Sequence, residues 1–144
     1  MLQDRHSYDE IPWVTEMRYL GIYFVQSRKL KCSLDAAKRG FHRSANSIFS
    51  KIGRTASEEV ILQIISSKCM PILMYGLETL PLQKSQLNSL DFVTNRLFMK
   101  LFRTTDIRII SLCQELFNFE LQSVQLECRC KKFCMVFYLV KFAF

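Results

Sequence analysis

The chain is poor in residues that break regular structure, with four Gly and three Pro among 144 residues. A β-sandwich needs turn residues at short intervals, so this scarcity disfavours one and favours long helices. Histidine is also scarce, since His6 and His42 are the only two. No Ser or Cys stands in a nucleophile-elbow context, and no Gly-rich phosphate loop is present. The sequence therefore offers no familiar catalytic arrangement of its own.

The N-terminus lacks the apolar run of a secretion signal and carries charged and polar residues instead. We therefore expect an intracellular protein, nuclear or cytoplasmic and not secreted, whose six cysteines are reduced. The spacing Cys128-x-Cys130-x3-Cys134 is compatible with a metal clip, but a fourth ligand and a second pair at zinc spacing are missing. Small buried cysteines of the core are the preferred interpretation.

Residues 133–144 are very apolar but include Lys141. A helix needs about 20 apolar residues to cross a bilayer, so we expect no membrane span here and no membrane partner. The segment is better explained as a tail that continues the last helix without its packing partners.

Positive charge is concentrated in one part of the chain. Residues 28–54 hold eight basic side chains and one acid, Asp35, so this stretch alone accounts for the formal net charge of +7. A local excess of this kind is typical of a surface that follows nucleic-acid phosphates. An ordinary solvated helix face is the alternative that charge alone leaves open.

Residue patterns predict short strands over 12–14 and 17–25, followed by helices. Gly21 is a poor strand former, which makes it a candidate for a close contact or a bulge. Arg39 and Arg43 fall on one stripe of a predicted helix over 33–52, and Gly53 would end that helix. Its other stripe is apolar and consists of Leu34, Ala37, Phe41, Ala45, Ile48 and Ile52.

Start and stop signals predict the later helices. Thr55-Ala56-Ser57-Glu58 has capping-box spacing, and Pro71 predicts a kink before a buried segment over 72–77. Ser85 and Asp106 are expected to begin two more helices, Asn118 to end the second of them, and a last helix to start near Leu121. The side chains expected inside include Leu34, Phe41, Ile48, Ile64, Leu87, Leu90, Val93, Leu97, Leu101, Ile109, Ile110, Leu112, Leu116 and Phe117. The predicted fold is mainly α, with a short N-terminal β-hairpin or strand before four or five helices.

Several phrases in order suggest a family. They are Tyr19-Leu20-Gly21-Ile22, the basic helix after it, Pro71-Ile72-Leu73-Met74-Tyr75-Gly76-x-Glu78, and Arg96-Leu97-Phe98-Met99-Lys100-Leu101-Phe102. Together they resemble the region behind the catalytic core in reverse transcriptases of non-LTR (LINE-type) retrotransposons. The resemblance implies a palm-end hairpin over 1–27, a thumb-like helical domain over 28–132 and the apolar tail over 133–144.

The resemblance implies that Tyr19, Leu20 and Gly21 belong to the primer-grip hairpin, where a bare backbone at Gly21 lets nucleic acid approach. For the phrase around Tyr75 and Gly76 it implies core packing. The charge pattern adds Lys38, Arg39, Arg43 and Lys51 as candidates for contact with the backbone of an RNA/DNA primer-template duplex.

The chain departs from this family where chemistry is concerned. Polymerases hold two Mg²⁺ ions about 3.5–4 Å apart on acidic side chains. In the family these acids precede the hairpin, but here only Asp9-Glu10 does so, without flanking apolar strands. We therefore expect no enzyme activity, no cofactor and no metal site in this chain, since Mg²⁺ would belong to the intact parent enzyme. The alternative is a decayed or domesticated helical protein-interaction module, which self-associates through exposed apolar surface.

Overall fold

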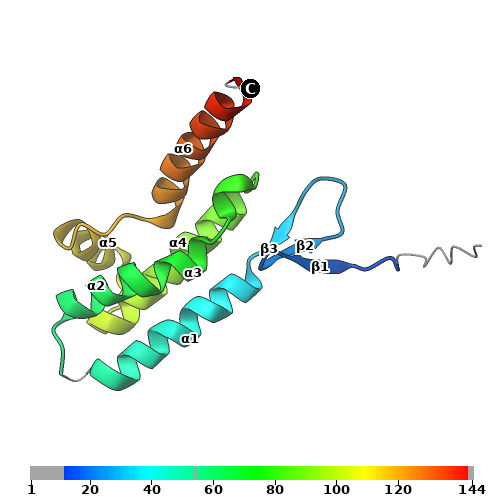
Figure 1. Ribbon diagram of the computed structural model, residues 1–144. Coiled ribbons are helices and arrows are strands. Elements are labelled where there is room, and N and C mark those ends of the chain that lie inside the picture. The colour runs from blue at the N-terminus through cyan, green and yellow to red at the C-terminus, as the bar shows by residue number, and fades with distance from the viewer. Residues whose placement is uncertain (1–11, 54, 143–144) are drawn as a thin grey trace, which may run out of the picture.

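The structure is a computed structural model that describes residues 12–53 and 55–142. A small antiparallel sheet near the N-terminus is followed by helices, which make up most of the described chain (Figure 1). The predicted fold class is thereby confirmed. His6 and the pair Asp9-Glu10 lie outside the described residues.

The segment predicted as one strand over 17–25 is a β-hairpin. Strands β1 (Glu16–Tyr19) and β2 (Ile22–Val25) pair antiparallel, and Leu20 and Gly21 form the turn with φ of 46° and 85°. Two positive φ angles match the type I′ turn that suits the twist of a hairpin, so the single strand was a wrong prediction. A third strand, β3 (Cys32–Ser33), pairs with β2, whereas residues 12–14 form no strand.

Helix α1 (Asp35–Ile52) packs its apolar stripe inward, as predicted, with Phe41 and Ala45 fully buried. It ends at Gly53, but the φ of −64° at Gly53 is right-handed, so no left-handed cap is formed. The expected capping box at Thr55 is also wrong. The backbone N and side-chain Oγ1 of Thr55 instead donate to the carbonyl of Ile52, at 3.0 and 3.3 Å.

The chain breaks at Pro71, as predicted, so that α2 (Glu58–Lys68) and α3 (Met70–Met74) are separate helices. Helix α2 buries Ile61, Leu62 and Ile65, while Ile64 is only half-buried, because α2 faces the core about one residue away from the expected register. In the segment 72–77, Leu73, Met74 and Leu77 are buried and Gly76 is half-buried. Ile72 and Tyr75 are exposed, so the core-packing role expected of Tyr75 is wrong. A short 3-10 helix, η1 (Leu77–Thr79), follows.

Helix α4 (Lys84–Phe102) is capped by Gln83 and Gln86 rather than by Ser85, and Leu90, Val93 and Leu97 lie in the core as expected. Asp106 caps α5 (Ile107–Leu116) as predicted, since its Oδ1 accepts the Arg108 amide at 2.8 Å.

The inward face predicted for α5 is wrong for three residues. Ile110 is buried, but Ile109, Leu112 and Leu116 are 46%, 55% and 74% exposed. This helix has only ten residues and covers α4 with one narrow stripe that continues to half-buried Cys113 and Phe117. The predicted stripe was rotated by one residue, which is about 100° on a helix.

Helix α6 (Gln122–Phe142) begins against α4 and then extends away from the other helices (Figure 1). The Thr94 hydroxyl donates to Gln122 Oε1 in the core, and Asp91 Oδ1 accepts the Ser123 amide at 2.9 Å. These two bonds anchor the first turn of α6. Within the described residues, no helix combines the length and apolarity that crossing a membrane requires.

Candidate nucleic-acid interface

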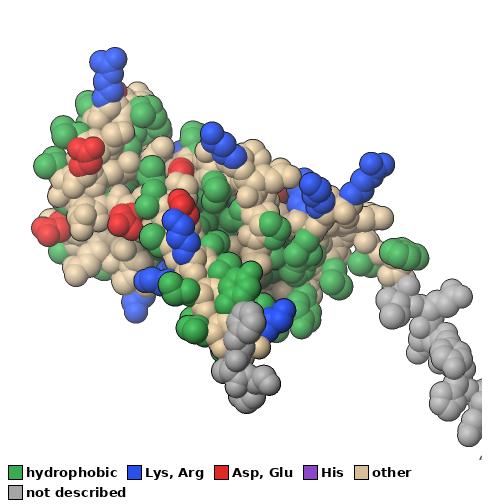
Figure 2. Space-filling view, turned by 90° about the horizontal axis from the view of Figure 1, so that it is seen from above, with side chains coloured by type: hydrophobic (Ala, Val, Ile, Leu, Met, Phe, Trp, Pro, Cys, Tyr) green, Lys and Arg blue, Asp and Glu red, His purple; other side chains and the backbone are tan. Residues whose placement is uncertain are grey.

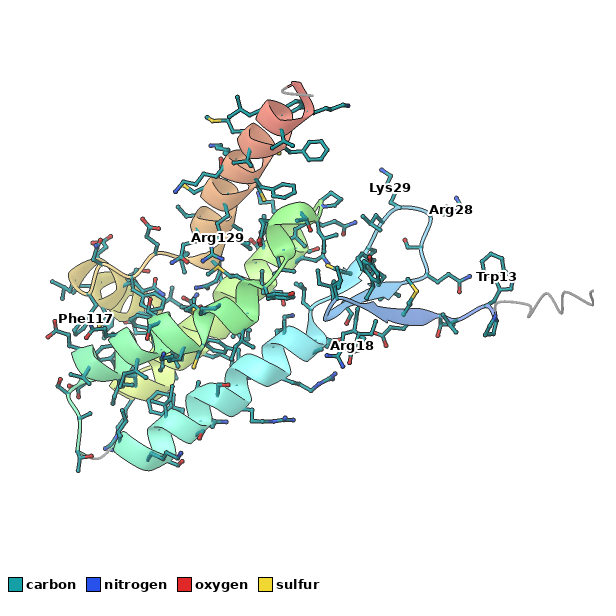
Figure 3. The ribbon with its side chains drawn as sticks, in the orientation of Figure 1. Trp13, Arg18, Arg28, Lys29, Phe117 and Arg129 are labelled. Atoms are coloured by element: carbon teal, nitrogen blue, oxygen red, sulfur yellow. The ribbon has the colours of Figure 1, made fainter. Side chains whose placement is uncertain are left out.

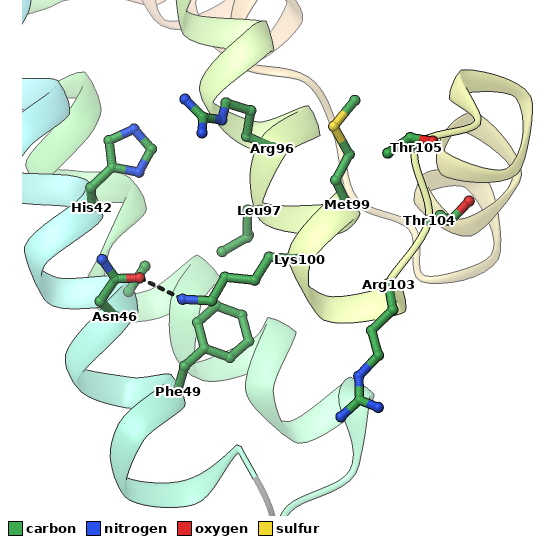
Figure 4. Close-up of a pocket in the computed structure, with 11 residues that line it drawn as sticks. His42, Asn46, Phe49, Arg96, Leu97, Met99, Lys100, Arg103, Thr104 and Thr105 are labelled. Atoms are coloured by element: carbon green, nitrogen blue, oxygen red, sulfur yellow. Dashed lines mark hydrogen bonds between the residues drawn. The ribbon is translucent and has the colours of Figure 1, made fainter.

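A basic groove lies between the middle of α1 and the C-terminal half of α4 (Figure 4). Its volume is about 630 Å³. Helix α1 contributes His42, Asn46 and Phe49 to one wall. The other wall and the far end are lined by Arg96, Leu97, Met99, Lys100, Arg103, Thr104 and Thr105.

Two cations of α4 share one side of that helix, since Arg96 and Lys100 follow the spacing i, i+4. Arg103 lines the groove from the C-terminal end of α4, one residue beyond the helix. Lys100 is held across the groove, because its Nζ donates to Asn46 Oδ1 at 2.7 Å and lies 4.8 Å from the ring centroid of Phe49. Its ammonium is therefore held against α1, although Lys100 is exposed.

His42 is half-buried beside these cations. Burial lowers its pKa below the usual value, and the nearby charges of Arg96, Lys100 and Lys38 lower it further. An anion bound in the groove would raise this pKa again, because a nearby negative charge favours the charged form of His42.

The positive charge of the groove is not neutralised by acids. None of the described residues that line it is acidic. Among residues 12–53 and 55–142 the structure contains one ion pair, between Lys131 and Glu127 of α6, with Nζ and Oε1 2.8 Å apart. The cations of α1 and α4 are therefore available to an external anion.

The structure places the four predicted cations of α1 in different surroundings. Arg39 and Arg43 are exposed on the stripe next to the groove wall, and Lys51 is exposed in the last turn of α1. Lys38 is half-buried, and its Nζ donates to Ser89 Oγ of α4. Lys38 thus joins the two helices in addition to contributing charge.

Tyr19 and Gly21 do not line this groove. Tyr19 ends β1 and is 60% exposed, whereas Gly21 belongs to the hairpin turn. A Cβ built on Gly21 would lie 3.4 Å from Cε1 of Tyr75, so the space above this glycine is occupied by the Tyr75 ring. Gly21 lines a second cavity, between the hairpin and α3, that also includes Ala36 and Ala37 of α1.

The backbone of Arg103 is unusual for a non-glycine residue. It ends α4 with a φ of 52°, a left-handed conformation in which glycine is favoured. The conformation turns the chain sharply at the edge of the groove, so that Thr104 and Thr105 line the groove as well.

Sequence reasoning missed Arg96, Lys100 and Arg103 as members of this surface. The spacing of Arg96 and Lys100 carried the signal, but basic residues are sparse in that part of the chain and all three cations lie outside residues 28–54. Only the packing of α4 beside α1 brings them next to the predicted residues.

The cysteines are all free. Cys32 and Cys69 are buried, and burial raises the pKa of both thiols. Cys128 and Cys134 are exposed and Cys130 is half-buried, so the prediction of core cysteines is wrong for these three. In the part of the chain that the structure describes, no group of three or more Cys, His, Asp or Glu is placed to hold a metal ion.

Comparisons of the chain with protein-family models, with curated proteins and with solved structures found no match.

Proposed function

We propose that this chain binds the sugar-phosphate backbone of a nucleic-acid duplex with the basic surface of α1 and α4. In this proposal it is a non-catalytic fragment of a reverse transcriptase of the non-LTR retrotransposon type, and the duplex is an RNA/DNA primer-template. The observation that carries the proposal is a groove lined by Arg96, Lys100 and Arg103 without any acid, beside which α1 exposes Arg39 and Arg43.

The dimensions of this surface suit a duplex. From Lys38 to Lys51, α1 extends about 20 Å at 1.5 Å per residue, which corresponds to roughly six base-pair steps of 3.4 Å. Arg39 and Arg43 would contact phosphates along one strand, while Arg96, Lys100 and Arg103 would contact the backbone from the other side of the groove. Contacts of this kind position a duplex without reading its sequence.

The hairpin supports the same proposal in a different way. Tyr19 lies at the end of β1, and the hairpin meets the first turns of α1 around the cavity that contains Ala36 and Ala37. A duplex that follows α1 from the groove toward its N-terminal end would therefore reach the hairpin turn. The helices after the hairpin correspond in this proposal to the thumb of the parent polymerase.

Fluorescence anisotropy with a labelled RNA/DNA duplex of about 20 base pairs tests the proposal. If these five cations of α1 and α4 each displace one counterion, log affinity falls with log salt concentration with a slope of about −4.5. Arg96→Ala with Lys100→Ala should reduce the magnitude of this slope by about 2 and weaken binding at low salt. Arg39→Ala with Arg43→Ala should do the same.

Arg28→Ala with Lys29→Ala is the charge-matched control. These residues belong to the basic stretch 28–54, but they lie in the β2–β3 loop beyond the N-terminal end of α1 (Figure 3). The proposal expects a slope close to that of the unmodified chain. Binding that is independent of salt, or a loss in the control equal to that in the Arg96 and Lys100 variant, would contradict it. Far-UV circular dichroism verifies that each variant keeps its fold.

A further inference from the structure

The C-terminal half of α6 carries apolar side chains on all sides. Its large apolar residues are between 41% and 68% exposed, and they are Phe133, Met135, Val136, Phe137, Tyr138, Leu139 and Val140. Figure 2 shows green side chains gathered around this end of the molecule. A helix that is apolar all round is normally buried, and a contiguous exposed patch of this kind marks an interaction site.

One side of this segment forms a shallow groove of about 440 Å³, here named the α6 outer face. It is lined by Lys131, Cys134, Met135, Tyr138 and Leu139. Met135 follows the buried Leu126 by nine residues, or about 900° at 100° per residue, so it points away from the side that packs on α4. These residues follow the spacing i, i+3, i+4, i+7, i+8, so they form one continuous stripe along the helix, against which a second helix can pack.

We propose that the α6 outer face pairs with the same face of a second copy of this chain, which forms a symmetric dimer of α6 helices. The α6 outer face contains three large apolar side chains, Met135, Tyr138 and Leu139, each more than half exposed. At roughly 100 Å² for each side chain, two copies bury about 600 Å². This area is below the ~1,000 Å² of a stable interface, so the expected dimer is a weak one that forms at high concentration.

The charge distribution also favours a second copy at this position. The chain carries a net charge of +7, so the basic surface of α1 and α4 repels another copy. The α6 outer face contains one charged side chain, Lys131, and its ion pair with Glu127 compensates that charge. Residues 133–140 have no charged side chain, so two copies can meet along this segment with less repulsion than at the basic surface of α1 and α4.

A lipid surface fits this segment less well. Residues 133–140 extend only about 12 Å along the helix, less than half of a ~30 Å hydrocarbon layer. A helix that lies in the interface between lipid and water has a charged face opposite its apolar face, and residues 133–140 have none.

Sedimentation equilibrium of the full chain between about 1 and 200 µM tests the dimer. The expected result is a reversible equilibrium that stops at two copies, with association strengthened by salt because screening reduces the repulsion between copies. Met135→Lys with Leu139→Lys should weaken the dimer by at least tenfold, because two cations per copy would face two cations of the partner.

Leu112→Lys with Leu116→Lys is the matched control, since these α5 residues are also exposed, by 55% and 74%, but lie outside the α6 outer face. This control should leave the dimer constant unchanged. The proposal would be overturned by a chain that stays monomeric at 200 µM, by one that assembles beyond two copies, or by equal effects of the two variants. It would also be overturned by binding to anionic lipid vesicles that persists in the variant with Met135→Lys and Leu139→Lys.

Discussion

Replacing Thr94 by Val removes the hydroxyl that anchors the start of α6. Thr94 and Gln122 are both fully buried, and the Thr94 hydroxyl donates to Gln122 Oε1. The amide nitrogen of Gln122 has a much weaker partner, because Nε2 lies 3.9 Å from Sδ of Met70. Sulfur is a poor acceptor, so this amide depends on Thr94 for its one strong hydrogen bond.

The expected loss of unfolding free energy depends on which buried polar groups each substitution leaves without a hydrogen-bond partner. Val matches Thr in shape, so Thr94→Val makes no cavity but leaves the Gln122 carbonyl oxygen without a donor. An unsatisfied buried polar group costs about 1–3 kcal/mol, and that is the expected loss of unfolding free energy. Gln122→Leu should be nearly neutral, because the Thr94 hydroxyl can turn to a carbonyl of its own helix and the poorly satisfied amide is removed.

Combining the two substitutions should recover most of the loss. Replacing both partners by apolar groups of similar shape is close to neutral, so the double variant should unfold within about 1 kcal/mol of the unmodified chain. Urea denaturation followed by circular dichroism measures these differences as shifts in midpoint at constant slope. A double variant that is no more stable than Thr94→Val alone would refute the view that an unpaired amide oxygen is the source of the cost.

Two further predictions concern the hairpin contact and the groove. Gly76→Ala should lower the unfolding free energy by about 1–2 kcal/mol, because a left-handed φ is costly for alanine; an unchanged urea midpoint would contradict this. The φ of Gly76 is 68°, and its added Cβ would lie 2.6 Å from Cδ1 of Ile22. Duplex affinity should rise as pH falls from 7.5 toward 6, because phosphates raise the lowered pKa of His42 and binding then takes up a proton. His42→Gln should flatten this pH dependence in anisotropy titrations, and an equal pH dependence in both proteins would contradict the proposed proton uptake.

Much of the helical part of the fold can be predicted from the spacing of apolar residues and from the residues that start and stop helices. The stripe of α1, the break at Pro71 and the Asp106 cap were all predicted correctly, because each depends on residues that are close in the chain. The errors arise where contacts between residues far apart in the chain decide which side of a helix is buried. The register of α5 depends on which side of a ten-residue helix faces α4, and a stripe of alternating Ile and Leu residues fits either of two adjacent registers.

The part of the candidate site on α1 could be predicted from the sequence, and the part on α4 could not, for a related reason. Arg39 and Arg43 are recognisable within a run of basic residues, and their exposure agrees with that prediction. Arg96 and Lys100 lie more than fifty residues further along, in a helix whose apolar side chains dominate its pattern. Their membership of the groove depends on the packing of α4 against α1, which Lys38 and Lys100 maintain by bonds to Ser89 and Asn46.

The phrases around Gly21 and Gly76, far apart in the chain, meet in space. The turn at Gly21 lies against the ring of Tyr75, and the bare backbone of Gly76 lies against the side chain of Ile22. Both glycines have positive φ, so each contact depends on a backbone conformation that other residues adopt at a cost. The hairpin is thereby held beside the first turns of α1, while the basic groove begins at His42, about 10 Å from the start of the same helix at 1.5 Å per residue. Helix α1 therefore sets the distance between the hairpin and the groove, and a ligand that follows this helix meets both at a fixed separation.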